Sequence, residues 1–94
     1  MNIVWSPTAR ADLRHIEAYI AERNPRAAAK VAHAILAGVE DLQRFPGIGR
    51  PGRVPDTREL AISNTPYVVP YRVVAQTIDI IAVIHGARRW PDTL

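Results

Sequence analysis

The fold of this chain is decided by two runs near its C-terminus, Tyr67-Val-Val-Pro-Tyr-Arg72 and Ile78-Asp-Ile-Ile-Ala-Val-Ile84-His85-Gly-Ala-Arg88-Arg89-Trp90. Both runs are rich in branched and aromatic residues, which favour β-strands. Only Ala75-Gln76 separates the predicted strands 67–74 and 77–84, so they should pair as a hairpin. The second run ends in a basic and aromatic cluster, which suggests contact with an anion or a partner at this end of the sheet.

Upstream of the hairpin, the sequence predicts one short strand and two helices. Asn2–Trp5 is apolar and branched, as expected of a strand. Ser6-Pro7 and Asn24-Pro25 each place a capping residue before a proline, the pattern that begins a helix. The second helix should run from Pro25 to about Arg44. Apolar residues recur at helical spacing, at Ala9, Leu13, Ile16 and Ile20 in the first helix and at Ala28, Val31, Ala32, Ile35, Val39 and Leu42 in the second.

The remaining elements complete an α+β domain. Phe45-Pro-Gly-Ile-Gly49 ends the second helix, a loop over 46–57 follows, and Arg58–Ile62 is a further strand. The order is β-α-α-β-β-β, and one tight turn makes the helices an antiparallel hairpin. This N-terminal helical hairpin is predicted to cover one face of a small antiparallel sheet. Pro70 cannot donate a ladder hydrogen bond, so an edge position or a bulge is expected there.

Composition restricts the classes of protein that this chain can be. Its 94 residues make one domain, residues 1–94, and 48% hydrophobic residues suffice for a small core. The chain has no cysteine, which excludes disulfides and thiolate metal sites and fits a reducing cytoplasm. Its apolar runs are too short to span a bilayer and it shows no signal-peptide pattern, so we expect a cytoplasmic protein without a membrane partner.

No cofactor or metal site is predicted. His15, His33 and His85 are too scattered for metal-ligand spacing. The glycines of the loop over 46–57 are not followed by the Gly-Lys-Ser/Thr sequence of a phosphate-binding loop.

The positive charge is concentrated in the second half of the chain. The formal net charge is +3, and all of the 12 basic residues except Lys30 are Arg, a surplus that a GC-rich genome largely explains. Residues 1–48 hold six basic and five acidic groups, whereas residues 49–91 hold six Arg against three acidic groups. Arginine suits bidentate contact with carboxylate or phosphate. The second half is therefore expected to carry most of the positive field.

Alternation along the predicted strands assigns side chains to two faces of the sheet. Charged Asp79 and Arg72 mark the face that the helices leave open, and strict alternation puts His85 on that face with Asp79. Glu59 points the same way if its neighbours in the strand face the helices. Glu59, Arg72 and His85 are thus expected to share the open face, and three residues should lie just beyond its rim: Arg88, Arg89 and Trp90.

Two interpretations of this set remain open on the residues alone. The set holds the groups that RNA cleavage needs: a carboxylate or histidine to take the 2′-hydroxyl proton, an arginine for the phosphate, and an acid for the leaving oxygen. The competing interpretation, which the residues favour, is a cross-strand Glu–Arg pair beside a satisfied histidine. Trp90 is similarly either a stacking platform or a side chain that packs the C-terminal tail down, and packing is the commoner role.

These runs together resemble the RelE/ParE superfamily, the toxins of type II toxin–antitoxin modules. The likeness spans nearly the whole chain. It rests on Trp5-Ser-Pro, on the helix motif Asp12-Leu-x-x-Ile16-x-x-Tyr19-Ile20, on Phe45-Pro-Gly-Ile-Gly-Arg50-Pro-Gly and on the two closing strands. The long helical hairpin and the motifs Tyr71-Arg-Val and Val83-Ile-His are closer to the ParE branch than to the RelE branch.

The two branches of the superfamily differ in action. RelE-like members cleave mRNA in the ribosomal A site, whereas ParE-like members poison DNA gyrase. The nuclease branch carries an Arg where this chain has Val68, and a Lys-rich strand where this chain has only Arg58, followed by Glu59. Gly86-Ala-Arg88 does match the nuclease branch. In a nuclease, Arg58 and Arg88 would hold phosphate, and His85 or Glu59 would carry protons.

The resemblance therefore implies a growth-inhibiting or plasmid-stabilising toxin that acts on DNA gyrase by binding. An mRNA endonuclease acting on the ribosome and an inactive antitoxin-binding member remain the alternatives. The resemblance also implies a cognate antitoxin, whose flexible acidic segment folds over the toxin in a hetero-oligomer. The residues expected to contact target or antitoxin are Arg50, Arg53, Arg72, His85, Arg88, Arg89 and Trp90.

Overall fold

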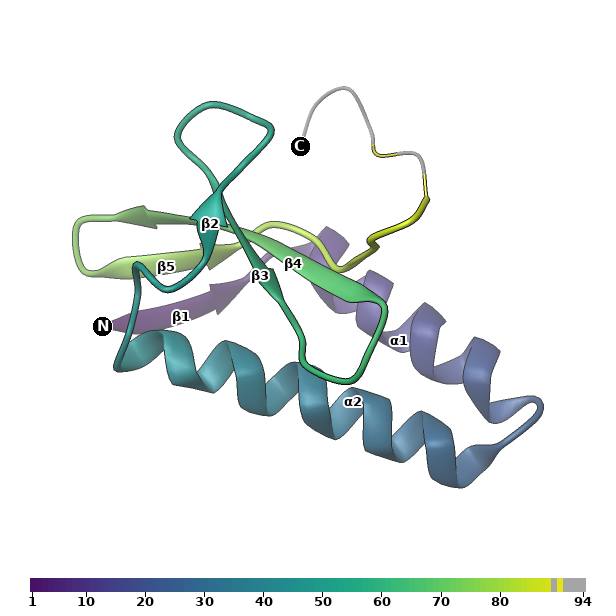
Figure 1. The fold of residues 1–94 in the computed structure, drawn as a ribbon. Coiled ribbons are helices and arrows are strands. Elements are labelled where there is room, and N and C mark those ends of the chain that lie inside the picture. The colour runs from purple at the N-terminus through teal and green to yellow at the C-terminus, as the bar shows by residue number, and fades with distance from the viewer. Residues whose placement is uncertain (89, 91–94) are drawn as a thin grey trace.

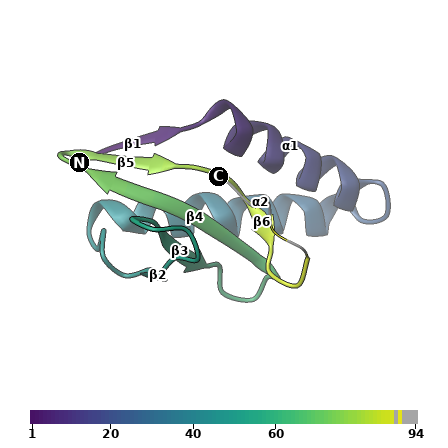
Figure 2. The same cartoon turned by 90° about the horizontal axis from the view of Figure 1, so that it is seen from above.

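The computed structural model describes residues 1–88 and residue 90. It has two layers: a hairpin of helices α1 (Pro7–Ala21) and α2 (Pro25–Glu40) covers one face of a six-stranded sheet (Figures 1 and 2). The predicted α+β class is confirmed. No helix among the described residues is long and apolar enough to cross a bilayer.

Both helices begin where their capping residues predict. The Ser6 side-chain oxygen accepts a hydrogen bond from Ala9 N at 2.9 Å, and the Asn24 side-chain oxygen accepts one from Ala27 N at 3.0 Å. Proline follows each cap, and its fixed φ suits the first helical position. α2 ends at Glu40, one turn before the predicted end, because the chain tightens into a 3₁₀ turn, η1 (Asp41–Gln43).

The sheet is mixed, because its first strand adds in parallel to a set of otherwise antiparallel strands. The hairpin predicted near the C-terminus is present, and the N-terminal strand pairs with the second strand of this hairpin. The helices provide the crossover that a parallel connection needs. The strands in spatial order are β1 (Asn2–Trp5), β5 (Thr77–Ile80), β4 (Tyr67–Val74), β3 (Arg58–Ala61) and β2 (Arg50–Pro51), with β6 (Ile84–His85) also paired to β4.

The single strand predicted over 77–84 is interrupted, and that part of the prediction was wrong. β5 ends at Ile80, opposite Tyr71, and the chain rejoins β4 at Ile84, opposite Val68. Residues 81–83 therefore face only residues 69–70, which makes this segment a β-bulge.

Pro70 accounts for the bulge, which confirms the irregularity expected at this proline. Proline has no N–H to donate to the neighbouring strand, and its carbonyl oxygen accepts a hydrogen bond from Ile81 N at 3.0 Å. The Val83 N–H donates instead to Asp12 Oδ2 of α1 at 3.0 Å. The bulge thus ties the sheet to the first helix.

The hydrophobic core lies between the helical hairpin and the sheet. Leu42, the last residue of the predicted apolar stripe, is fully buried although it lies in η1, beyond the end of α2. The largest fully buried side chains of the described residues come from both layers: Ile35, Val39, Leu42, Val69, Pro70, Tyr71, Ile78 and Ile80.

We expect Asp12→Ala to destabilise the fold. The substitution removes the acceptor of the Val83 N–H, and an unsatisfied buried donor costs about 1–3 kcal/mol. Glu17→Ala is the matched control, because Glu17 is exposed on the same helix; it should stay within about 0.5 kcal/mol of the wild type. Chemical denaturation of both variants measures this, and equal free energies of unfolding would show that the Asp12 contact contributes nothing.

Candidate functional site

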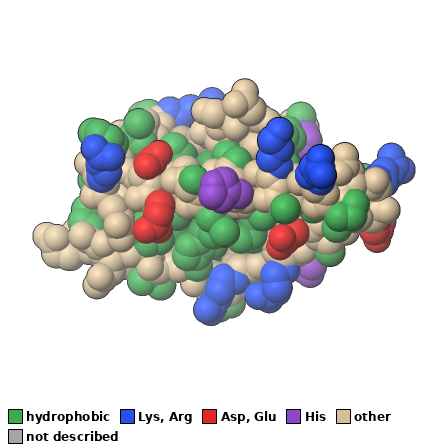
Figure 3. Space-filling model, turned by 90° about the horizontal axis from the view of Figure 1, so that it is seen from below, with side chains coloured by type: hydrophobic (Ala, Val, Ile, Leu, Met, Phe, Trp, Pro, Cys, Tyr) green, Lys and Arg blue, Asp and Glu red, His purple; other side chains and the backbone are tan. Residues whose placement is uncertain are grey.

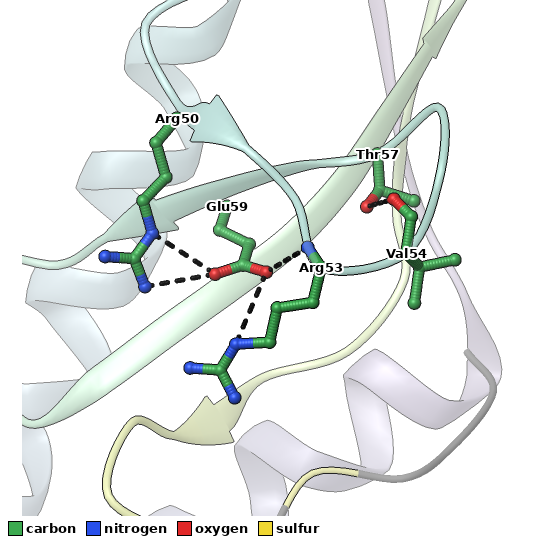
Figure 4. Close-up of polar contacts among 5 residues, drawn as sticks. All are labelled: Arg50, Arg53, Val54, Thr57 and Glu59. Atoms are coloured by element: carbon green, nitrogen blue, oxygen red, sulfur yellow. Dashed lines mark hydrogen bonds and ion pairs between the residues drawn. The ribbon is translucent and has the colours of Figure 1, made fainter.

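Glu59 is a buried carboxylate on the face of the sheet away from the helices. Its side chain is 2% exposed. Glu59 Oε1 accepts hydrogen bonds from Arg50 Nε at 3.2 Å and Arg50 Nη2 at 3.0 Å. Glu59 Oε2 accepts one from the Arg53 backbone N at 2.8 Å and lies 3.8 Å from Arg53 Nε (Figure 4). Both carboxylate oxygens are therefore engaged.

These contacts make Glu59 the anchor of the loop between β2 and β3, which rises from the sheet on the side away from the helices (Figure 1). Arg50 lies directly opposite Glu59 in the strand register, so the two form a cross-strand pair. Such a pair was the alternative that the residues favoured, with Arg50 rather than Arg72 as the partner. Arg72 lies opposite Asp79 instead.

Arg53 also meets Trp90, far along the sequence. The Arg53 guanidinium carbon lies 3.8 Å from the centre of the Trp90 ring, which is a cation–π contact. The structure thus brings three of the residues expected to contact target or antitoxin, Arg50, Arg53 and Trp90, together with Glu59. Arg89 lies outside the described residues.

Arg58 points to the opposite face of the sheet from Glu59 and supports a different loop. Arg58 Nη1 donates to the Gly47 carbonyl at 3.2 Å and to the Gly49 carbonyl at 2.8 Å. The buried Tyr71 hydroxyl accepts from Gly49 N at 2.9 Å and donates to the Pro46 carbonyl at 2.7 Å. A side chain at Gly49 would collide with the Tyr71 ring, because its Cβ would lie 2.7 Å from Tyr71 Cε1.

His85 does not lie on the face that strict alternation predicted. The bulge adds one residue before it, so His85 lies opposite Tyr67, on the other face from Arg72. The His85 and Tyr67 rings meet edge to face, with centroids 5.7 Å apart. His85 Nδ1 accepts a hydrogen bond from Ala87 N at 3.2 Å. The prediction that Glu59, Arg72 and His85 share one face was therefore wrong.

Arg58 and His85 lie on the opposite face of the sheet from Glu59, so the residues that a nuclease would use are divided between two faces. Arg88 is exposed in the turn after β6. Among the described residues, no group of three or more His, Asp or Glu side chains is placed to hold a metal ion. What the site presents is a set of cations on a rigid frame, which suits contact with another macromolecule.

A groove between β1, α1 and α2 was not predicted from the sequence. Its volume is about 600 Å³ and three elements line it, so no single sequence pattern could reveal it. The available signal was the apolar Leu36, which lies off the predicted stripe of α2. The groove is lined by Ile3, Val4, Trp5, Arg10, Leu13, Arg14 and Leu36.

The helical hairpin packs on a mixed sheet, and Tyr71 holds the loop before β2 through Pro46 and Gly49. This chain is a toxin of the RelE/ParE superfamily. Within it, the chain belongs to the family described as the ParE toxin of the type II toxin–antitoxin system, parDE, whose model matches residues 3–90. Membership of this family implies an antitoxin as partner. The resemblance drawn from the sequence is confirmed.

Individual relatives agree with this assignment. The chain is 40% identical to the protein Y4kP of Sinorhizobium fredii over 93 residues, which cover 99% of this chain and 96% of Y4kP. It is 30% identical to toxin RelE1 of Caulobacter vibrioides over 87 residues, covering 90% and 92% of the two chains. A solved chain from the chromosomal ParDE system of P. aeruginosa superposes with a TM-score of 0.83 at 32% identity, covering 90% of this chain and 95% of that one.

Tyr71→Phe should destabilise the fold through loss of its hydroxyl alone. The substitution leaves the Pro46 carbonyl and Gly49 N–H without their partner, at a cost of about 1–3 kcal/mol. Tyr67→Phe removes a hydroxyl from a half-buried position on the same strand and should change the free energy of unfolding by less than about 0.5 kcal/mol. Urea denaturation compares the two variants. Equal losses in the free energy of unfolding would show that the hydrogen bonds of the Tyr71 hydroxyl do not stabilise the loop.

Proposed function

We propose that this toxin stops growth by binding DNA gyrase and that it does not cut RNA. Two findings support the gyrase target: the match to the ParE toxin family over residues 3–90, and the likeness to a chain of a ParDE system. A gyrase target also implies action in the cytoplasm. The observation that favours binding over cleavage is the burial and hydrogen bonding of the Glu59 carboxylate.

The residues that a nuclease of this superfamily would use are occupied in other roles. A proton-transferring carboxylate must reach its substrate, but Glu59 is 2% exposed and bound on both oxygens. Arg58 is hydrogen-bonded to two loop carbonyls. Val68, at the position of the nuclease arginine, is an apolar side chain that is only 7% exposed.

The alternative is a ribosome-dependent mRNA endonuclease. Arg88 favours it, because this exposed arginine follows Gly86 and Ala87 as in the nuclease branch. Relatives from Caulobacter vibrioides with the names RelE1 and RelE2 also match nearly the whole chain. A member that binds only its antitoxin and strikes no target is the third possibility.

An assay of purified toxin with gyrase, supercoiled DNA and ATP distinguishes these three functions. We expect gyrase–DNA cleavage complexes to be trapped in the presence of the toxin. Translating ribosomes incubated with the same toxin should yield intact mRNA. If gyrase is unaffected and the mRNA is cut, the proposal fails in favour of the nuclease, and Arg88→Ala should then abolish cutting. If neither target responds, the chain is an antitoxin-binding member.

Glu59→Gln should lower the stability of the fold. The amide can offer only one oxygen, so the contacts to Arg50 and the Arg53 backbone cannot both be kept. We expect a loss of about 1–3 kcal/mol in the free energy of unfolding. Chemical denaturation of the variant and of the wild type measures this loss. An unchanged free energy of unfolding would contradict the role of Glu59 as the anchor of the loop between β2 and β3.

A further inference from the structure

One end of the molecule exposes several large apolar side chains. Figures 1 and 2 show the N-terminus, the loop after η1 and the turn between β4 and β5 together at this end. Hydrogen bonds join these segments: Gln43 Nε2 donates to the Met1 carbonyl at 3.4 Å, and Asn2 N donates to the Gln76 carbonyl at 2.8 Å. Scattered exposed apolar residues need no explanation, but contiguous ones mark interaction sites. The apolar end consists of Met1, Phe45, Ile48, Val73 and Val74.

Phe45 and Ile48 lie on a loop that is held in one conformation. They are 53% and 60% exposed. Tyr71 and Arg58 together make four hydrogen bonds to the backbone of this loop. Ile48 N also donates to the Phe45 carbonyl at 3.1 Å, which closes a turn between the two residues. Because the loop is already ordered, a partner that binds these two side chains does not have to order the backbone.

The charges in contact with this loop are positive. The Arg44 guanidinium carbon lies 5.5 Å from the centre of the Phe45 ring, and Arg58 donates to two loop carbonyls. The ion pairs found among the described residues all involve Glu59, so neither arginine is neutralised by a carboxylate there. Figure 3 shows a basic side chain next to hydrophobic ones at this end, the left of the view, with acidic side chains further in. The apolar residues of the loop therefore have a cationic border.

These features select the class of partner. Aromatic and aliphatic side chains that anchor an interface need an apolar pocket, which a folded protein offers and a phosphate backbone does not. The cationic border favours acidic side chains around that pocket. A second copy of this chain is disfavoured, because the contact would bring the arginines of both copies together. The partner is thus a folded protein with an apolar pocket and an acidic rim.

We propose that the toxin binds its target through the apolar end: Phe45 and Ile48 enter an apolar pocket of the target, and Arg44 and Arg58 meet acidic side chains at its rim. The ordered loop favours the target over the antitoxin, because it fits a pocket that already exists, whereas the antitoxin segment that the resemblance implies is flexible until it binds. The inference rests on the proposed function, in which the toxin acts by binding DNA gyrase, and it names the surface that this binding uses.

Toxin variants are compared for inhibition of gyrase supercoiling and for growth arrest on expression in bacteria. Phe45→Ala and Ile48→Asp should each raise the toxin concentration for half-maximal inhibition about tenfold or more, and both should relieve growth arrest. Tyr19→Ala is the matched control, because Tyr19 is a large side chain that is 64% exposed on α1; it should inhibit as the wild type does. Circular dichroism establishes that each variant is folded.

A charge reversal tests the cationic border separately. Arg44→Glu should weaken inhibition and make it less sensitive to salt. Arg23→Glu changes an exposed arginine just beyond the end of α1 and should inhibit as the wild type does. Equal losses from the two substitutions would show that only the net charge matters, and the contact with an acidic rim would then be wrong.

Wild-type inhibition by Phe45→Ala and Ile48→Asp in both assays overturns the proposal. So does a loss of antitoxin binding by these variants with inhibition unchanged, because the apolar end would then serve the antitoxin. If the wild-type toxin arrests growth without affecting gyrase, the proposed function fails, and growth arrest by the variants still decides whether the apolar end contacts the target. If the wild-type toxin neither arrests growth nor affects gyrase, the proposed function and the target surface fail together.

Discussion

The structure on the side of the sheet away from the helices depends on the burial of one charge, the carboxylate of Glu59. A buried carboxylate is costly unless it is paired and hydrogen-bonded. Arg50 from β2 and the Arg53 backbone meet that requirement, and in doing so they fix the loop between β2 and β3. The same loop places the Arg53 guanidinium against Trp90. Compensation of this charge therefore organises the basic surface and occupies both carboxylate oxygens.

The sequence predicted those parts of the fold that depend on local signals. Ser6 and Asn24 located the helix starts, and the missing N–H of Pro70 indicated an irregular sheet. The consequence of that irregularity could not be predicted, because one extra residue in the bulge reverses the face of everything after it. His85 was misplaced for this reason. The partners of Glu59 and the groove beside Leu36 were missed because they join segments that are distant in sequence.

The molecule presents two surfaces with different character. One is the cationic frame of Arg50 and Arg53 over the sheet, where charge is presented on a rigid loop. The other is the groove between β1, α1 and α2, where the lining combines apolar side chains with Arg10 and Arg14. Membership of the ParE toxin family makes an antitoxin the expected partner, and two separate surfaces would let a toxin meet its antitoxin and its target through different contacts.

The stoichiometry of inhibition distinguishes the proposed binding of gyrase from catalytic turnover. Toxin is titrated into a fixed amount of gyrase while the rate of DNA supercoiling is measured. We expect inhibition to rise in proportion to added toxin and to saturate once toxin matches gyrase. An unchanged supercoiling rate at excess toxin, with mRNA cut on ribosomes by far less toxin than there are ribosomes, would contradict it.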